Sequence, residues 1–299
     1  MKVLITGGTG QLGTALQQTM PDSVGILAPP RAEFDLAHLD GLCPALDRFA
    51  PQALINAGAF TDVDGAEDNP AAAMRINADA PGILAEWCAE NGARFIQIST
   101  DFVFGGNNEY TPLPPGASIA PISVYGQTKA AGEATVRDAD HNATILRTSW
   151  LYGPRFGTGF VDRMLRLALT RTEISAVTDQ IGSPTSAIAL ARIVWRCLES
   201  GRGMGETHHG VCKGAASRFD LVSSAFDFAR SKGVLFACRE VRPTTSDAFP
   251  TPARRPAWSA LDPKSTEEML GITVPDWKSA LSDHIASILP RLAEEGDLP

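Results

Sequence analysis

Short apolar segments alternate with amphipathic segments through the first half of the chain. Helical periodicity is expected over residues 11–20, 38–49, 70–91, 122–137 and 159–171. The apolar segments between them have the length of buried β-strands and cover Lys2–Thr6, Val24–Ala28, Ala53–Asn56, Arg94–Ser99 and Thr144–Thr148. Several are apolar throughout and all are separated by helices, which predicts an α/β protein with a parallel, doubly wound Rossmann-type sheet. Pro81 should kink or break the third helix.

The alternation becomes less regular after about residue 150. Strands are expected at 173–178, 207–211 and 235–241, and helices at 186–199 and 217–231. Residues 242–263 are rich in Pro, Thr and Arg and predict a long ordered loop, a kind of segment that usually carries function. We therefore divide the chain into residues 1–149, built on the large sheet, and residues 150–299, a smaller C-terminal α/β lobe. The boundary is approximate, and the two parts are expected to be interwoven.

Composition narrows the class of protein. The 299 residues carry a formal net charge of -8, which disfavours a nucleic-acid surface. No apolar run reaches the roughly 18 residues that a membrane span needs. Five cysteines are scattered without a Cys-x-x-Cys pair, so we expect reduced thiols and a cytoplasmic protein. The histidines form no His-Glu-x-x-His motif, and no metal site is expected.

A glycine-rich turn joins the first strand to the first helix. Gly7 would provide a tight turn, Gly10 a close approach of the backbone to a pyrophosphate, and Gly13 the contact between helix and strand. The helix behind them offers free N–H groups and a favourable dipole to phosphates. The pattern predicts that residues 1–149 are a dinucleotide-binding domain and residues 150–299 a substrate-binding lobe. A glycine turn that serves packing alone is the alternative.

The end of the second strand indicates which dinucleotide would bind. An acid at this place normally bonds the adenosine ribose of NAD, but the chain has no acid there and continues through two prolines to Arg31. Arg31 could bind a 2′-phosphate through charge-assisted hydrogen bonds, which favours NADPH, with NADH possible. Alternatively, Arg31 is a solvated loop charge, and Glu33 nearby weakens the inference.

Three side chains around the fourth strand predict proton chemistry. Tyr125 and Lys129 stand four residues apart on an expected helix, so they share one helix face. A phenol has a pKa of about 10, and a neighbouring ammonium should lower that pKa toward neutrality. Thr100, between Ser99 and Asp101 at the carboxyl end of the strand, could hydrogen-bond a carbonyl oxygen as negative charge develops there. A surface Tyr–Lys pair and a hydroxyl that caps a turn are the alternatives.

Together these motifs resemble the extended short-chain dehydrogenase/reductase superfamily and, within it, the family of dTDP-4-dehydrorhamnose reductases. The resemblance runs over almost the full length, and its later segments are the more discriminating. The matching segments are residues 10–13, 35–36, 56–59, 99–104, 124–133, 147–152, 179–185 and 250–256.

The resemblance implies reduction of the 4-keto group of a dTDP-4-keto-6-deoxy sugar by NADPH. Tyr125 would be the general acid, Lys129 would tune it and hold the nicotinamide ribose, and Thr100 would steady the substrate oxygen. The substrate contacts that it implies are Thr100, Asp101, Tyr125, Trp150 and Arg255, the last toward the diphosphate. The dinucleotide contacts that it implies are Gln11, Leu12, Asp35, Leu36, Ala57, Ala59 and Thr61. Trp150 as a core aromatic and Arg255 as a solvated charge are the alternatives.

Two departures from the family pattern narrow these expectations. Phe102 stands where the dehydratases of the superfamily carry a Glu that drives water loss, which disfavours dehydration. Ala15 stands where some of the reductases have a Glu that helps to hold Mg²⁺ at a dimer interface, so we expect no metal and either a monomer or a homodimer. Two other functions stay open: a regulatory subunit that binds NAD(P) without turnover, and a sugar-nucleotide epimerase, which the missing acid after the second strand disfavours.

Overall fold

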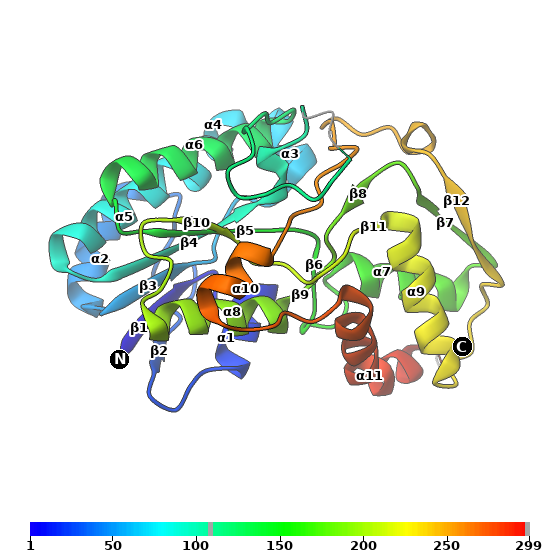
Figure 1. The fold of residues 1–299 in the computed structure, drawn as a ribbon. Helices are drawn as coiled ribbons and strands as arrows, with labels where there is room; N and C mark the ends of the chain where they lie inside the picture. The colour runs from blue at the N-terminus through cyan, green and yellow to red at the C-terminus, as the bar shows by residue number, and fades with distance from the viewer. Residues whose placement is uncertain (107–109, 297–299) are drawn as a thin grey trace.

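A six-stranded parallel sheet with strand order β10-β5-β4-β3-β1-β2 forms the centre of the molecule (Figure 1). The structure is a computed structural model and describes residues 1–106 and 110–296. The strands are β1 (Lys2–Thr6), β2 (Gly25–Leu27), β3 (Ala53–Asn56), β4 (Arg94–Thr100), β5 (Thr144–Thr148) and β10 (Thr207–His209). The expected doubly wound sheet is confirmed. Strand order reverses between β1 and β3, and open sheets of this kind bind ligands beyond the carboxyl ends of the strands at such a point.

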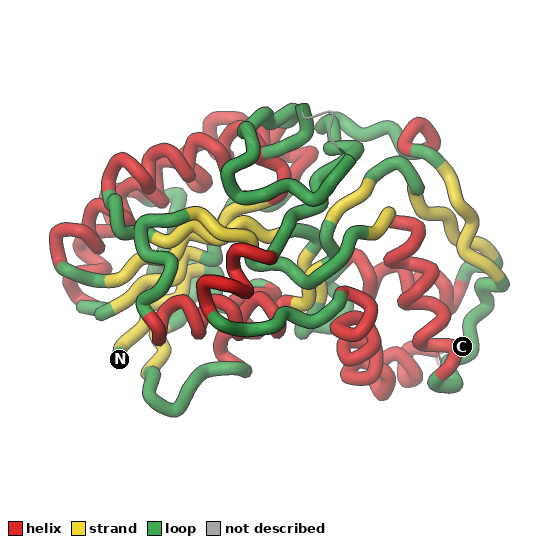
Figure 2. The backbone as a smooth tube through the Cα atoms, viewed as in Figure 1, coloured by secondary structure: helices red, strands yellow, loops and turns green. Residues whose placement is uncertain are grey.

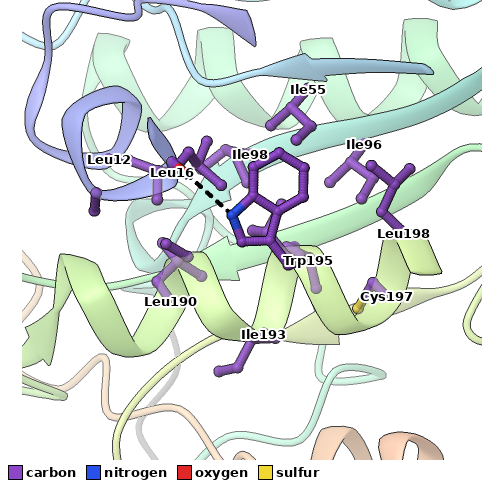
Figure 3. Packing of buried hydrophobic residues seen from close by; sticks show 14 of the residues in the cluster. Leu12, Leu16, Ile55, Ile96, Ile98, Leu190, Ile193, Trp195, Cys197 and Leu198 are labelled. Atoms are coloured by element: carbon purple, nitrogen blue, oxygen red, sulfur yellow. Dashed lines mark hydrogen bonds between the residues drawn. The ribbon is translucent and has the colours of Figure 1, made fainter. Parts of the chain in front are cut away.

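Helices cover both faces of the sheet, because its strands are apolar on both sides (Figure 1). One face carries α1 (Gln11–Gln18) and α8 (Ala187–Ser200), which pack against each other and enclose the core drawn in Figure 3. There the indole nitrogen of Trp195 donates to the carbonyl oxygen of Leu16 at 3.2 Å. The other face carries the remaining helices of this layer: η1 (Leu39–Gly41), α2 (Leu42–Phe49), α3 (Val63–Asp68), α4 (Pro70–Met74), η2 (Arg75–Asp79), α5 (Ala80–Asn91) and α6 (Val124–Ala139).

Pro81 does not end the helix in which it lies. The regular α-helix is instead interrupted before it, by the π-helical turn η2, and Pro81 falls in the first turn of α5, where its missing N–H is tolerated. The expected break is therefore displaced by a few residues. The turn places Asn77, whose side chain bonds the backbone of Phe60 and the hydroxyl of Thr128 on α6.

The second half of the chain builds a smaller lobe from helices and three two-stranded sheets, one of which lies at the outer edge of the molecule (Figure 2). Two elements after residue 150, β10 and α8, nevertheless belong to the large sheet and its covering layer. The lobe contains β6 (Leu151–Tyr152), α7 (Phe160–Thr170), β7 (Glu173–Val177), β8 (Ile181–Gly182), β9 (Thr185–Ser186), β11 (Ala216–Ser217), α9 (Arg218–Ser231), β12 (Glu240–Thr244), η4 (Ser246–Ala248) and α11 (Trp277–Gly296). Between η4 and α11, α10 (Lys264–Leu270) packs near α8 and β10.

The strand expected at 235–241 was placed too early. Strand β12 begins at Glu240 and pairs in parallel with β7, whereas Leu235 is 89% exposed and Phe236 stacks on Phe226 of α9. Pro243 is tolerated in β12 because this strand pairs with β7 on one side only and needs no hydrogen-bond donor on its other side. None of the described helices is long and apolar enough to cross a membrane.

Candidate active site

A cleft of about 1410 Å³ runs along the carboxyl edge of the large sheet and continues into the smaller lobe. Most of the predicted site residues lie together in the wall of this cleft, although they come from separate elements of both lobes. Those that line it are Gly7, Gly10, Gln11, Leu12, Gly13, Ala57, Ala59, Thr61, Thr100, Asp101, Tyr125, Lys129, Trp150 and Arg255.

Three predicted dinucleotide contacts lie outside the wall of the cleft, on the segment after β2. Arg31 and Asp35 form an exposed ion pair in which Nε of the arginine lies 3.2 Å from Oδ2 of the aspartate. Leu36 is buried and lies against Gly58, the neighbour of Ala57 in the cleft wall.

The turn between β1 and α1 has the shape of a phosphate cradle. Gly7 has φ +64°, and an added Cβ there would lie 2.8 Å from Cα of Gly58. An added Cβ at Gly13 would lie 2.3 Å from the carbonyl oxygen of Gly7, so only glycine permits α1 to approach the strand this closely. No side chain caps the start of α1 at Gly10, and Oε1 of Gln11 is buried without a partner among the described residues. The uncapped N–H groups at the start of α1 are donors, and together with the glycines they fit the pyrophosphate of a dinucleotide.

Close helix packing sets the position of Tyr125 in the first turn of α6. The hydroxyl of Ser123 caps this helix by accepting from the amide of Gly126 at 3.2 Å. An added Cβ at Gly126 would lie 2.2 Å from the carbonyl oxygen of Phe102, so glycine lets the start of α6 contact the short helix η3 (Asp101–Val103) that follows β4. The Phe102 ring then packs edge-on against the Tyr125 ring, with centroids 5.4 Å apart. Phe102 therefore supports the phenol and brings no acid to the cleft.

A chain of hydroxyls links Tyr125 to a buried carboxyl group. The Tyr125 side chain is hydrogen-bonded to that of Thr100, whose hydroxyl lies 3.2 Å from Oδ1 of Asp101. Burial raises the pKa of Tyr125 to about 12, an effect that the Asp101 charge increases and the Thr100 hydrogen bond opposes. The expectation that Lys129 lowers this pKa toward neutrality is wrong for this structure, since withdrawal from water dominates. Tyr125 is a protonated phenol at neutral pH.

Lys129 is 4% exposed, and burial lowers the pKa of its ammonium to about 8, an effect that the Glu133 carboxylate partly offsets. Its Nζ donates to the carbonyl oxygen of Ile98 at 2.7 Å. Glu133, one turn further along α6, forms a bidentate ion pair with Arg147, with hydrogen bonds of 2.8 and 2.7 Å. It also accepts a hydrogen bond from the Ser99 hydroxyl at 2.6 Å. The buried lysine is thus held on a charged network that connects α6, β4 and β5.

Asp101 is 2% exposed, and hydroxyl groups satisfy its carboxyl oxygens. Oδ2 accepts from Ser149 at 2.9 Å and from Ser259 at 2.6 Å, while Oδ1 faces Thr100. Burial raises the pKa of Asp101, and these hydroxyl donors oppose the rise. Asp101 reaches the cleft from the start of η3, directly after β4, and bonds Ser259, which lies 158 residues later in the chain.

Trp150 and Arg255 reach the cleft from separate segments of the chain. Trp150 has φ +47°, and an added Cβ at Gly182 would lie 2.6 Å from its indole ring, so glycine behind the ring is required. Arg255 is fixed by Asp64 of α3 through hydrogen bonds of 3.1 and 2.7 Å. The late loop is therefore fastened to α3, and the charge of Arg255 is already offset by a carboxylate.

Several cleft residues from the smaller lobe were not predicted from the sequence. Arg218 lies over Trp150, with Cζ 3.6 Å from the ring centroid, and Arg163 of α7 also lines the cleft. Ser217 and Asp220 form a capping box that could have located the start of α9, but nothing in the sequence indicates where the adjacent Arg218 points. Over the described residues, no three His, Cys, Asp or Glu side chains gather as a metal site.

Known proteins share both the sequence pattern and the fold. The family model described as RmlD substrate binding domain matches residues 1–289. A dTDP-4-dehydrorhamnose reductase of Sinorhizobium fredii is 37% identical over 288 residues, which are 94% of this chain and 95% of the relative. The crystal structure of a Clostridium acetobutylicum dTDP-4-dehydrorhamnose reductase superposes with a TM-score of 0.88 at 34% identity, covering 96% of this chain and 99% of that one. The Bacillus anthracis dTDP-4-dehydrorhamnose reductase, solved in complex with NADP, gives 0.87 at 31% identity, covering 95% and 98%.

Proposed function

The chain belongs to the RmlD substrate-binding-domain family, and on that premise we propose that it is a dTDP-4-dehydrorhamnose reductase. It reduces the 4-keto group of dTDP-4-dehydro-6-deoxy-L-mannose to the alcohol of dTDP-L-rhamnose with NADPH, and NADH is a possible substitute. The observation that carries the proposal is one cleft that joins the glycine cradle to Thr100, Tyr125 and Lys129. A binding protein needs the cradle alone, so a buried lysine one helical turn from a protonated phenol favours turnover.

The positions of Thr100, Tyr125 and Lys129 support a different role for each side chain in the reaction. The Thr100 hydroxyl and the Tyr125 phenol converge on one point of the cleft, where both can hydrogen-bond the carbonyl oxygen of the substrate. Tyr125 holds its proton at neutral pH and donates it to the developing alkoxide, which is a stronger base than a phenolate. The ammonium of Lys129, one helical turn away, stabilises the phenolate that this transfer leaves.

The dinucleotide and the substrate would occupy successive parts of the cleft. Bound NADPH supplies the hydride that the carbonyl carbon receives. Gly7, Gly10 and Gly13 would hold its pyrophosphate, and Arg31 its 2′-phosphate. The other dinucleotide contacts that we propose are Gln11, Leu12, Asp35, Leu36, Ala57, Ala59 and Thr61, with Tyr125 and Lys129 at the nicotinamide ribose. For the sugar nucleotide we propose Thr100, Asp101, Tyr125, Trp150 and Arg255.

We further propose that residues 1–149 bind the dinucleotide and residues 150–299 the sugar nucleotide. The glycine turn in the first part and the cleft residues of α7 and α9 in the second support this division, while β10 and α8 support an interwoven boundary. The five cysteines are unpaired in the structure, in keeping with a cytoplasmic protein. We also propose that the protein binds no nucleic acid, which its net charge of -8 supports. We propose that it works as a monomer or a homodimer.

The test follows the absorbance of NADPH as dTDP-4-dehydro-6-deoxy-L-mannose is added. We expect oxidation of NADPH by the wild-type protein and almost none by Tyr125→Phe, which keeps the ring and loses the proton. Tyr110→Phe, at an exposed tyrosine outside the cleft wall, is the matched control and should keep full activity. The proposal would be contradicted if the wild-type protein binds NADPH but fails to oxidise it, whichever 4-keto sugar nucleotide is supplied. That result would favour a regulatory role.

A further inference from the structure

Arg218 enters the cleft from the start of α9 and is held by aromatic rings. Its guanidinium carbon lies 3.6 Å from the centroid of the Trp150 ring and 4.8 Å from that of Phe160. Trp150 is itself fixed by its left-handed backbone conformation and by the close contact with Gly182. A guanidinium stacked on a ring in this way keeps its N–H groups free at the edge of its plane.

No acid is bonded to Arg218 among the described residues. Within the described part of the chain, its guanidinium makes no hydrogen bond or ion pair. Asp101 is a nearby acid whose charge acts on Arg218, but its oxygens are taken up by the hydroxyls of Ser149, Ser259 and Thr100. Burial and the positive charges of Arg255 and Arg163 lower the pKa of Arg218 to about 10, so the side chain is charged at neutral pH.

The contrast with Arg255 is informative, because that arginine was the one expected to meet the diphosphate. Both N–H₂ groups of Arg255 are bonded to Asp64, so an incoming anion would have to share them with a carboxylate. Arg218 has no such competitor: its half-buried guanidinium lines the cleft without a bonded carboxylate, so an incoming anion can take all of its donors. In a protein of net charge -8, its position in the cleft thus marks a site for an anion.

On the basis of the proposed function, we propose that Arg218 binds the diphosphate of the sugar nucleotide, with Trp150 as the platform that orients its guanidinium. The electrostatic coupling to Asp101, which adjoins Thr100, places Arg218 on the sugar side of the cleft. A planar guanidinium can donate two parallel hydrogen bonds to phosphate oxygens. Trp150, which we propose as a contact of the sugar nucleotide, is in addition the positioning residue for Arg218.

Titration calorimetry with two ligands tests this assignment without relying on turnover. Thymidine 5′-diphosphate carries the phosphates, and thymidine lacks them. We expect Arg218→Met to weaken binding of the diphosphate about 10- to 100-fold, the value of a hydrogen-bonded ion pair, and to leave thymidine binding unchanged. Arg230→Met is the matched control, because Arg230 lies over Phe226 on the same helix but outside the cleft wall; it should change neither affinity.

The possible outcomes separate this inference from the proposed function. Equal diphosphate affinity in the wild type and Arg218→Met would overturn the role of Arg218 and leave the reductase proposal standing. A wild-type protein that binds neither ligand would count against the proposed function itself. Should thermal melting show that Arg218→Met is unfolded, Arg218→Lys takes its place. It keeps the charge and loses the paired donors, so a loss of about 3- to 10-fold is expected for the diphosphate alone, and unchanged affinity would overturn the inference.

Discussion

Lys129→Met is expected to make the protein more stable at pH 7 even though it removes the reductase activity. Lys129 is almost fully buried, and burial lowers the pKa of its ammonium from 10.5 to about 8. The unfolded chain retains the ordinary pKa and therefore binds the proton more tightly than the folded protein does. The charge consequently opposes folding, and a neutral side chain of similar length should relieve this cost.

The magnitude follows from the two pKa values. The gap between 10.5 and about 8 corresponds to about 3 kcal/mol, which is present in full below pH 8 and disappears as the pH rises to 10.5. Methionine loses the hydrogen bond to the carbonyl oxygen of Ile98, worth about 1 kcal/mol. That carbonyl keeps the side-chain amide of Gln97 as a donor at 2.9 Å, so it is not left unsatisfied. The net expectation is a gain of about 2 kcal/mol at pH 7.

Urea denaturation followed by tryptophan fluorescence measures this gain. The difference in unfolding free energy between Lys129→Met and the wild type should favour the variant at pH 7 and shrink or reverse by pH 10. Lys264→Met, at a lysine whose side chain is 74% exposed, is the control and should show no such dependence on pH. A variant that is less stable than the wild type by the same amount at both pH values would refute the reasoning, because burial of the charge would then carry no cost.

Three further substitutions test other parts of the account. Glu133→Gln leaves Arg147 as a buried, unpaired cation, so urea denaturation should show a loss of about 3–5 kcal/mol; a loss below 1 kcal/mol would show that the network tolerates the charge. Gly13→Ala should lower stability by about 1–3 kcal/mol through its clash in the cradle and weaken NADPH binding, whereas Gly41→Ala, which meets no neighbour, should do neither. Arg31→Ala should weaken binding of NADPH about 10-fold by calorimetry and leave NADH unaffected; equal losses would argue against a contact with the 2′-phosphate.

The parts of the site that the sequence predicts well are those that lie close together along the chain. Thr100 ends a strand whose apolar run is unmistakable, and Tyr125 and Lys129 share the face of the next long helix, so their meeting follows from the topology of a parallel sheet. The glycine turn is predictable for the same reason, since strand, turn and helix are consecutive.

The features that the sequence does not predict depend on contacts between distant segments. The pKa of Tyr125 rises because elements packed around it exclude water, whereas helix spacing alone suggested the opposite direction. Arg218 follows an ordinary helix cap, and only the folded lobe brings it over Trp150 from 68 residues earlier in the chain. Strand β12 was misplaced because hydrophobicity at Leu235 predicts burial, while its side chain projects into solvent.

The transfer of a labelled hydride tests the central claim most directly. NADPH carrying deuterium at the transferable C4 position would be incubated with the protein and dTDP-4-dehydro-6-deoxy-L-mannose, and the product examined by mass spectrometry and proton NMR. We expect one deuterium per molecule of dTDP-L-rhamnose, located at C4 of the sugar. Consumption of the substrate with no deuterium at C4, or no product at all from a protein that binds both ligands, would contradict it.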